Sequence, residues 1–170
     1  MMLIRIPNAI YQRMKGDLSR PHPYALERVG YLFTKPTTCT TLECSDYLPV
    51  PDSFYVDDSS VGAHLDHRAI VLAMKRADHK NEGVLHVHAH GGFGMPTFSP
   101  VDLGSHEVYL RSFRNANSHV THGVLLLSED SLVARVWVPN MSDPIEITHY
   151  VVTPSGFGDT VLGWLRRFFQ

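Results

Sequence analysis

The chain has 170 residues, of which 44% are hydrophobic and 19% are charged, and its formal net charge is −2. This length suits one globular domain over residues 1–170 and is too short for a typical (β/α)8 barrel. The near-neutral charge gives no general reason to expect nucleic-acid binding, and no apolar run suggests a signal peptide or a membrane span.

In the first half of the chain, runs of apolar residues alternate with turn-forming segments. Apolar spacing predicts a strand at 3–6, a helix at 8–18, strands at 27–34 and 39–48, and a helix at 60–80. We expect the two middle strands to pair as a hairpin. Cys39 and Cys44, the two cysteines of the chain, have no second pair to complete a zinc cluster, so we expect free thiols in a reducing cytoplasm.

The second half predicts strands at 83–90, 122–128, 132–138 and 145–153, with one helix beginning near residue 100 and another over 156–170. We expect the strands at 122–128 and 132–138 to form a second hairpin. This order of elements predicts an α/β fold with a mixed β-sheet flanked by helices.

The strand at 83–90 carries histidine at every second position from His86 to His90. Side chains two residues apart lie on the same face of a strand, so His86, His88 and His90 should share one face. After a glycine-rich loop, Ser99-Pro100-Val101-Asp102 has the pattern of a helix N-terminus, with serine as the cap and proline at the first helical position. The carboxylate of Asp102 should therefore point back toward the end of the histidine strand.

Together these residues predict a hydrolytic zinc site. Such a site needs three protein ligands, an open position for water and a carboxylate that can accept the proton of that water. His88, His90 and Asp102 are the expected ligands. Glu27, at the start of an apolar strand, is the candidate general base, and Ser99 is the candidate donor to a developing oxyanion.

The order of a glutamate before Gly-Tyr-Leu-Phe, then His-x-His, then Ser-x-x-Asp resembles the JAB/MPN metalloproteases, also called the JAMM family. The resemblance extends over roughly residues 3–153 and implies an MPN/JAB-like fold. It also implies that His88, His90 and Asp102 bind zinc, that Glu27 is the acid/base and that Ser99 supports the oxyanion.

The chain departs from the family pattern at two positions beside the ligands. Ala89 stands between the histidines, where the family usually has Ser or Thr, and Gly91 replaces the usual proline. The loop from His90 to Ser99 is also one residue longer than in eukaryotic members. We expect this loop to bulge without moving the ligands.

The resemblance implies a zinc-dependent isopeptidase or peptidase that cleaves after the C-terminal glycine of a ubiquitin-like protein. Compact members of this kind act in prokaryotic ubiquitin-like systems, antiphage systems among them, beside E1-like and E2-like enzymes. Either removal of the ubiquitin-like protein from a target or processing of its precursor would fit.

Other interpretations of these residues remain open. The main alternative is a non-catalytic MPN-type scaffold, although the intact ligand set argues against it. Another His-x-His metallohydrolase is a weaker alternative, because a barrel amidohydrolase needs a longer chain and a cupin needs a glutamate soon after the second histidine. His86 is expected to support the ligands or to face the substrate. The spacing of His64 and His67 on the predicted helix would permit metal binding, but we expect them to lie on a solvated helix face.

Overall fold

The structure, a computed structural model, describes residues 2–35, 40–58 and 62–154. Within them, one eight-stranded sheet combines parallel and antiparallel neighbours. In spatial order its strands are β10 (Tyr150–Thr153), β1 (Leu3–Pro7), β3 (Thr41–Pro49), β2 (Val29–Thr34), β6 (Gly83–Ala89), β7 (His122–Leu127), β8 (Leu132–Trp137) and β9 (Ile145–Ile147). The prediction of a mixed α/β sheet is confirmed, and so are both hairpins, β2–β3 and β7–β8.

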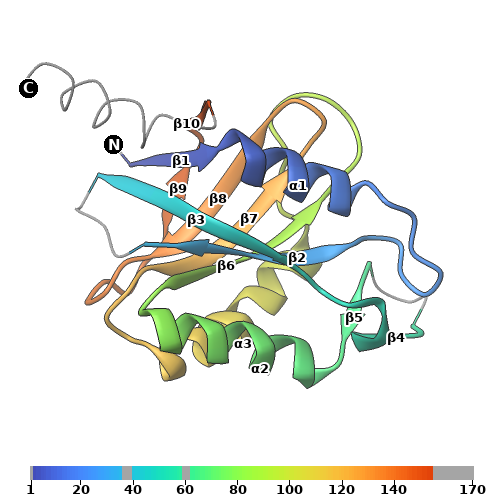
Figure 1. The fold of residues 1–170 in the computed structure, drawn as a ribbon, viewed down its shortest axis with the longest axis horizontal. Coiled ribbons are helices and arrows are strands. Elements are labelled where there is room, and N and C mark those ends of the chain that lie inside the picture. Colours follow the sequence, from blue (N-terminus) through green and yellow to red (C-terminus); the bar gives the residue numbers. More distant parts are fainter. Residues whose placement is uncertain (1, 36–39, 59–61, 155–170) are drawn as a thin grey trace, which may run out of the picture.

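Helices cover both faces of this sheet. The α-helices in the described residues are α1 (Asn8–Leu18), α2 (His67–Lys80) and α3 (Pro100–Ala116). Figure 1 shows α1 against one face, and α2 and α3 side by side against the other. A short 3-10 helix, η1 (Asp52–Phe54), and a small sheet of β4 (Tyr55–Val56) and β5 (His64–Leu65) lie between β3 and α2.

The sheet therefore separates two hydrophobic cores. On one face Met14 of α1 packs into a core that includes Leu32 and Leu85. On the other face Val84 of β6 and Phe113 of α3 belong to a second core beneath α2 and α3. Strands with a helix on each face must be apolar on both sides, which explains why every residue of β2 and β7 is buried.

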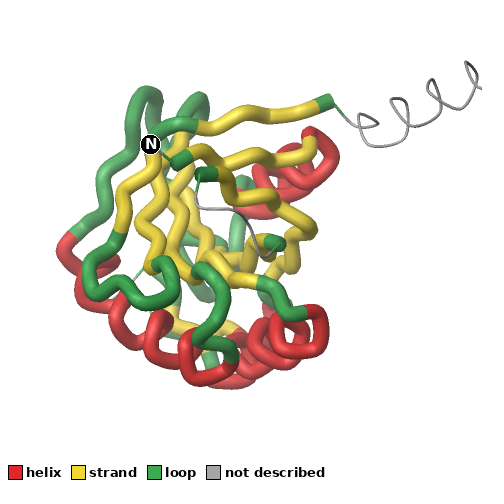
Figure 2. Tube along the Cα trace, turned by 90° about the vertical axis from the view of Figure 1, so that its left-hand side faces the viewer, coloured by secondary structure: helices red, strands yellow, loops and turns green. Residues whose placement is uncertain are grey.

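The prediction of one strand over 145–153 is wrong. β9 pairs with β8, whereas β10 pairs with β1 at the opposite end of the strand order. Thr148 and His149 alone connect them, and the carbonyl of His149 accepts a hydrogen bond from Ile4 N–H at 3.1 Å. Two residues bridge only a short gap, so the two edges of the sheet lie close together, and Figure 2 shows the resulting curl of the strands.

Other predicted boundaries shift by a few residues. α2 begins at His67 rather than at residue 60, because Asp66 caps it by accepting the N–H of Arg68. β3 begins at Thr41, and Cys39 lies outside the described residues, as does the predicted helix over 156–170. Cys44 is a buried free thiol, as expected. None of the helices in the described part of the chain is long and apolar enough to cross a membrane.

Candidate metal centre

Strand β6 presents its histidines on one face, as the alternation predicts. His86 stacks on Tyr109 of α3, whereas Leu85 belongs to the core on the opposite face. The ring centroids of His86 and His88 lie 6.0 Å apart, and those of His88 and His90 lie 5.1 Å apart. His90 follows the last residue of the strand, and its N–H still donates to a carbonyl of β7 at 2.9 Å.

The N-terminus of α3 holds Asp102 beside this row. Ser99 is the N-cap, and its Oγ accepts the N–H of Asp102 at 3.1 Å. The Oδ2 of Asp102 in turn accepts the N–H of Ser99 at 2.7 Å, which completes a capping box. The predicted helix start is confirmed, and the box fixes the direction in which the Asp102 carboxylate points.

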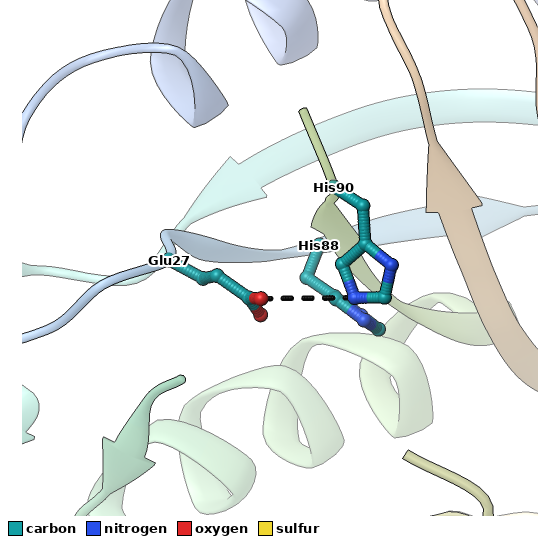
Figure 3. A group of neighbouring side chains, drawn as sticks. All are labelled: Glu27, His88 and His90. Carbon is teal, nitrogen blue, oxygen red and sulfur yellow. Dashed lines mark ion pairs between the residues drawn. The ribbon is translucent and has the colours of Figure 1, made fainter. Parts of the chain in front are cut away.

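Four side chains from three parts of the chain converge at this point. His88 Nε2 lies 3.1 Å from Asp102 Oδ1, and His90 Nε2 lies 3.6 Å from Asp102 Oδ2. His90 Nε2 also lies 3.6 Å from Glu27 Oε1, as Figure 3 shows. The ligand atoms of Glu27, His88 and His90 all lie within 4.8 Å of one another, so these three residues could hold a metal ion.

These distances match the spacing of ligands around a small tetrahedral cation. Ligand atoms about 2.0–2.1 Å from a zinc ion in tetrahedral geometry lie about 3.3 Å from each other. The measured contacts of 3.1 and 3.6 Å bracket that value. In addition, both ring nitrogens of His88 are buried without a hydrogen-bond partner among the described residues, although Nε2 is close to Asp102. Buried polar atoms normally have partners, so the donor set fits a bound metal.

Glu27 is not the first residue of a strand, which corrects the prediction. β2 begins at Val29, and the N–H of Val29 donates to the hydroxyl of Tyr55 rather than to a neighbouring strand. The N–H groups of Leu26 and Glu27 both donate to the carbonyl of Gly62, at 2.8 and 2.9 Å. Glu27 therefore lies in a bend that is tied to the segment before β5, but it still reaches the histidines.

Gly62 also makes room for the Glu27 carboxylate. A Cβ at position 62 would lie 2.8 Å from Glu27 Oε2 and 2.9 Å from its Cδ, closer than real Cβ contacts come. The absence of a side chain there lets the carboxylate turn toward His90.

A buried arginine fixes the same bend from its other side. Arg28 donates to the carbonyls of Arg20 and Pro21 at 2.9 and 3.0 Å, and to the carboxylate of Asp52 at 2.7 Å. His22, whose side chain is buried, lies 3.6 Å from the same carboxylate. These contacts hold the peptide on both sides of Glu27, so the position of its carboxylate depends on residues from three segments.

The electrostatics of the site keep Asp102 charged and the deeper histidines neutral. Burial alone would raise the pKa of Asp102, but the neighbouring His88 and the N–H of Ser99 outweigh it and hold that pKa well below its usual range. Burial lowers the pKa of His86 well below its usual value, and it lowers the pKa of His106 to about 4, with Arg135 adding to the effect.

Two hollows meet at this centre. One, of about 470 Å³, extends between α2 and α3 and includes Glu27, His88 and Asp102 in its wall. The other, of about 610 Å³, lies on the outer side of the site and is lined by Glu27, His90, Ser99 and neighbouring residues. The site therefore opens to a surface groove on one side and to a deeper pocket on the other.

The glycine-rich loop after His90 is anchored away from the site. Gly92 and Gly94 have φ angles of 102° and 86°, which residues with a side chain rarely adopt. The carbonyl of Gly92 accepts the N–H of Glu129, and the N–H of Gly94 donates to Asp130. Phe93, between the two glycines, is 85% exposed. These hydrogen bonds anchor the loop to the β7–β8 turn.

His64 and His67, the alternative histidine pair, do not join a metal site in the described residues. His64 lies in β5 rather than on a helix and contacts Asp58 at 3.0 Å. His67 is the exposed first residue of α2 and contacts Asp66 at 3.0 Å.

The sequence analysis missed three residues near the site: Gly62, His106 and Tyr109. The two on α3 follow Asp102 by four and seven residues, a spacing that places side chains on one helix face. That periodicity could have identified them. No local signal identifies Gly62, whose role depends on its distance from Glu27 in the folded chain.

A scan against protein-family models gave no match to this chain, and a search of curated proteins gave none either.

Proposed function

We propose that this protein is a zinc-dependent peptidase or isopeptidase of the JAB/MPN type. The observation that carries the proposal is the convergence of Glu27, His88, His90 and Asp102, from three distant parts of the chain, onto one partly open site. A mixed sheet with helices on both faces supports the MPN/JAB-like fold.

His88, His90 and Asp102 would hold the zinc. Both carboxylates of the site are within reach of the histidines, but Asp102 lies 3.1 and 3.6 Å from His88 and His90, whereas Glu27 lies 3.6 Å from His90 and only within 4.8 Å of His88. Two imidazole nitrogens and one carboxylate oxygen form a common ligand set of hydrolytic zinc sites. Bound zinc would lower the pKa of a water molecule and polarise the scissile carbonyl.

Glu27 is then the residue that moves protons. Its side chain is 30% exposed, so it can meet both water and substrate. In the proposed reaction the carboxylate of Glu27 takes a proton from the attacking water and later donates it to the leaving nitrogen. The hydroxyl of Ser99 accepts from the N–H of Asp102, so its own proton is available to the oxyanion of the tetrahedral intermediate.

The substrate we propose is the C-terminal tail of a ubiquitin-like protein, cleaved after its final glycine, within a system that includes E1-like and E2-like enzymes. The outer groove supports this proposal, because it passes Glu27, His90 and Ser99 and is open enough for an extended tail. The same residues would serve deconjugation and precursor processing.

Metal content is the first test, measured by elemental analysis of the purified protein. We expect about one zinc per chain in the wild type and in His67→Ala, and none in His88→Ala. His67 is the matched control because it is an exposed histidine outside the site. Absence of zinc from all three after reconstitution would favour the non-catalytic scaffold.

Cleavage is the second test. Ubiquitin-like proteins with a short C-terminal peptide extension are incubated with the zinc-loaded wild type or with His88→Ala. The masses of the products are then measured by mass spectrometry. We expect cleavage after the last glycine by the wild type alone. A zinc-loaded wild type that cleaves none of a broad panel would contradict the proposed substrate.

A further inference from the structure

The pocket between α2 and α3 has features that a glycine tail does not need. Its volume is about 470 Å³, and it begins directly at Glu27, His88 and Asp102. A glycine has no side chain to place there. Ligand pockets in proteins combine apolar walls with polar groups that orient the ligand, and this pocket is lined by both kinds of side chain.

Part of the pocket wall is apolar, next to polar residues that include Asp58, His64 and Ser105. Leu65 and Ile70 line one side, and Val108 and Tyr109 of α3 line the other. Val108 is 62% exposed, and Val101 at the mouth is 65% exposed, although both adjoin the pocket. A bound apolar group would cover these side chains.

Two buried histidines in the pocket wall lack hydrogen-bond partners. His86 is 7% exposed, and its Nε2 has no partner among the described residues. His106 is 3% exposed, and neither of its ring nitrogens has a partner there. Both rings line the pocket. Buried polar atoms are normally satisfied, so these nitrogens point to a polar group that enters the pocket.

The aromatic surroundings of these rings narrow the choice of ligand. His86 stacks on Tyr109 with ring centroids 3.9 Å apart, and Phe98 meets His106 edge to face at 4.8 Å. Planar side chains pack well against such rings. A neutral imidazole offers one hydrogen-bond donor and one acceptor, and a phenol hydroxyl can both accept and donate.

We propose that this pocket receives a tyrosine side chain of the substrate, from a residue next to or near the scissile bond. The aromatic ring would lie against the apolar walls, and its hydroxyl would pair with His86 or His106. The position of this residue relative to the bond rests on the proposed peptidase function, whereas binding of the phenol group does not. The protein would then recognise two features of its substrate, the tyrosine side chain and the final glycine.

The binding test uses three probes: N-acetyl-tyrosinamide, N-acetyl-phenylalaninamide and N-acetyl-glycinamide. Their dissociation constants for the zinc-loaded full chain are measured by ligand-observed NMR titration. We expect the tyrosine probe to bind about fivefold more tightly than the phenylalanine probe, the contribution of one neutral hydrogen bond. The glycine probe should show no binding.

Variants locate the binding. Ile70→Trp fills the pocket and should abolish binding of both aromatic probes. Ser105→Leu fills the pocket from α3 and should have the same effect, so it replaces the first variant if that variant does not fold. Val71→Trp is the matched control, because it places the same residue one position along α2, outside the pocket lining. The double variant His86→Phe/His106→Phe should bind the tyrosine and phenylalanine probes equally.

Equal affinity of the wild type for the tyrosine and phenylalanine probes would overturn the proposal, and so would unchanged binding in both pocket-filling variants. Failure of the peptidase function gives a different result, in which the tyrosine probe binds selectively but no substrate is cleaved. If cleavage occurs, substrates with tyrosine placed at successive positions on each side of the final glycine identify the residue that enters the pocket. A rate independent of tyrosine at every position would refute its role in the substrate.

Discussion

The two faces of strand β6 bury different kinds of side chain. Leu85 and Val87 on one face are fully buried in an apolar core, where every contact contributes to stability. His86 and His88 on the other face are also buried, but three of their ring nitrogens have no hydrogen-bond partner in the described structure. The same strand thus stabilises the fold with one face and presents unsatisfied ligands with the other.

This difference indicates how a small domain can remain folded while it carries a metal site with unpaired buried nitrogens. Unpaired buried polar atoms destabilise a fold by about 1–3 kcal/mol each, a large part of a typical total stability. Here the strand that carries them lies in the middle of the sheet, with β2 and β7 on either side. Burial of the apolar side chains on one face of β6 can offset the free-energy cost of the unpaired nitrogens on the other. Substitutions on the two faces should therefore have different consequences.

The largest expected effect is on activity, from Glu27→Gln. Loss of a general base typically slows catalysis by about 100- to 10,000-fold. We expect a decrease of this size in cleavage rate, with zinc content and the urea midpoint unchanged. The companion variant Asp102→Ala should lose zinc as well as activity. Loss of zinc in Glu27→Gln but not in Asp102→Ala would reverse the roles of the two carboxylates.

On the apolar face, Leu85→Ala should destabilise the protein strongly. Truncation of a fully buried leucine costs about 2–5 kcal/mol, and Leu85 has no exposed surface. Urea unfolding followed by circular dichroism measures the change. Leu103→Ala is the control, since Leu103 is 42% exposed on α3 and should change stability by less than about 0.5 kcal/mol. Equal effects of the two substitutions would contradict the assigned core.

Gly62→Ala should affect the site without affecting the metal. The added Cβ would displace the Glu27 carboxylate, with which it would come within 2.8 Å. Misplacement of a catalytic group by about 1 Å can cost about 100-fold in rate. We expect a decrease of about 10- to 100-fold, with zinc content equal to that of the wild type. Gly104→Ala, where nothing lies near the added Cβ, should leave the rate unchanged.

Acid should destabilise the metal-free protein through buried histidines outside the ligand set. His122 accepts the N–H of Val84 at Nδ1, and its Nε2 lies 2.6 Å from the carbonyl of Asn117. Burial chiefly, with help from Arg114, lowers its pKa below the usual 6.5 despite that carbonyl. The unfolded chain therefore binds the proton first, and stability present above pH 6.5 is lost as the pH falls toward the folded pKa.

Urea unfolding at a series of pH values from about 8 to 5 would measure this loss, whose slope is at most about 1.4 kcal/mol per pH unit for one histidine. In His122→Asn the amide oxygen can still accept from Val84 but does not titrate, so the slope should be smaller. An unchanged slope would mean that other histidines determine the acid sensitivity.

The smallest expected effect is a gain in stability from His86→Phe. Phenylalanine preserves a ring that can stack on Tyr109 and removes the unpartnered Nε2. We expect the metal-free protein to gain about 1 kcal/mol in unfolding free energy. A loss of stability would show that the nitrogen has a partner in solution.

Much of the site follows from short-range rules. Alternation along β6 is enough to place His88 and His90 together, and the capping pattern is enough to place Asp102 at the first turn of α3. These rules involve contacts within a few residues of the chain. They do not depend on how the rest of the protein folds.

The tertiary structure alone decided the position of Glu27 and the shape of the pocket. Glu27 reaches His90 because its bend is tied to Gly62, and His106 meets the pocket because α3 packs beside α2. The division of residues 145–153 between opposite edges of the sheet was equally invisible, because this segment is rich in β-branched residues throughout and predicts a single strand. Such arrangements depend on strand pairing and close packing between distant segments, and the periodicity of a single segment carries no information about its partner.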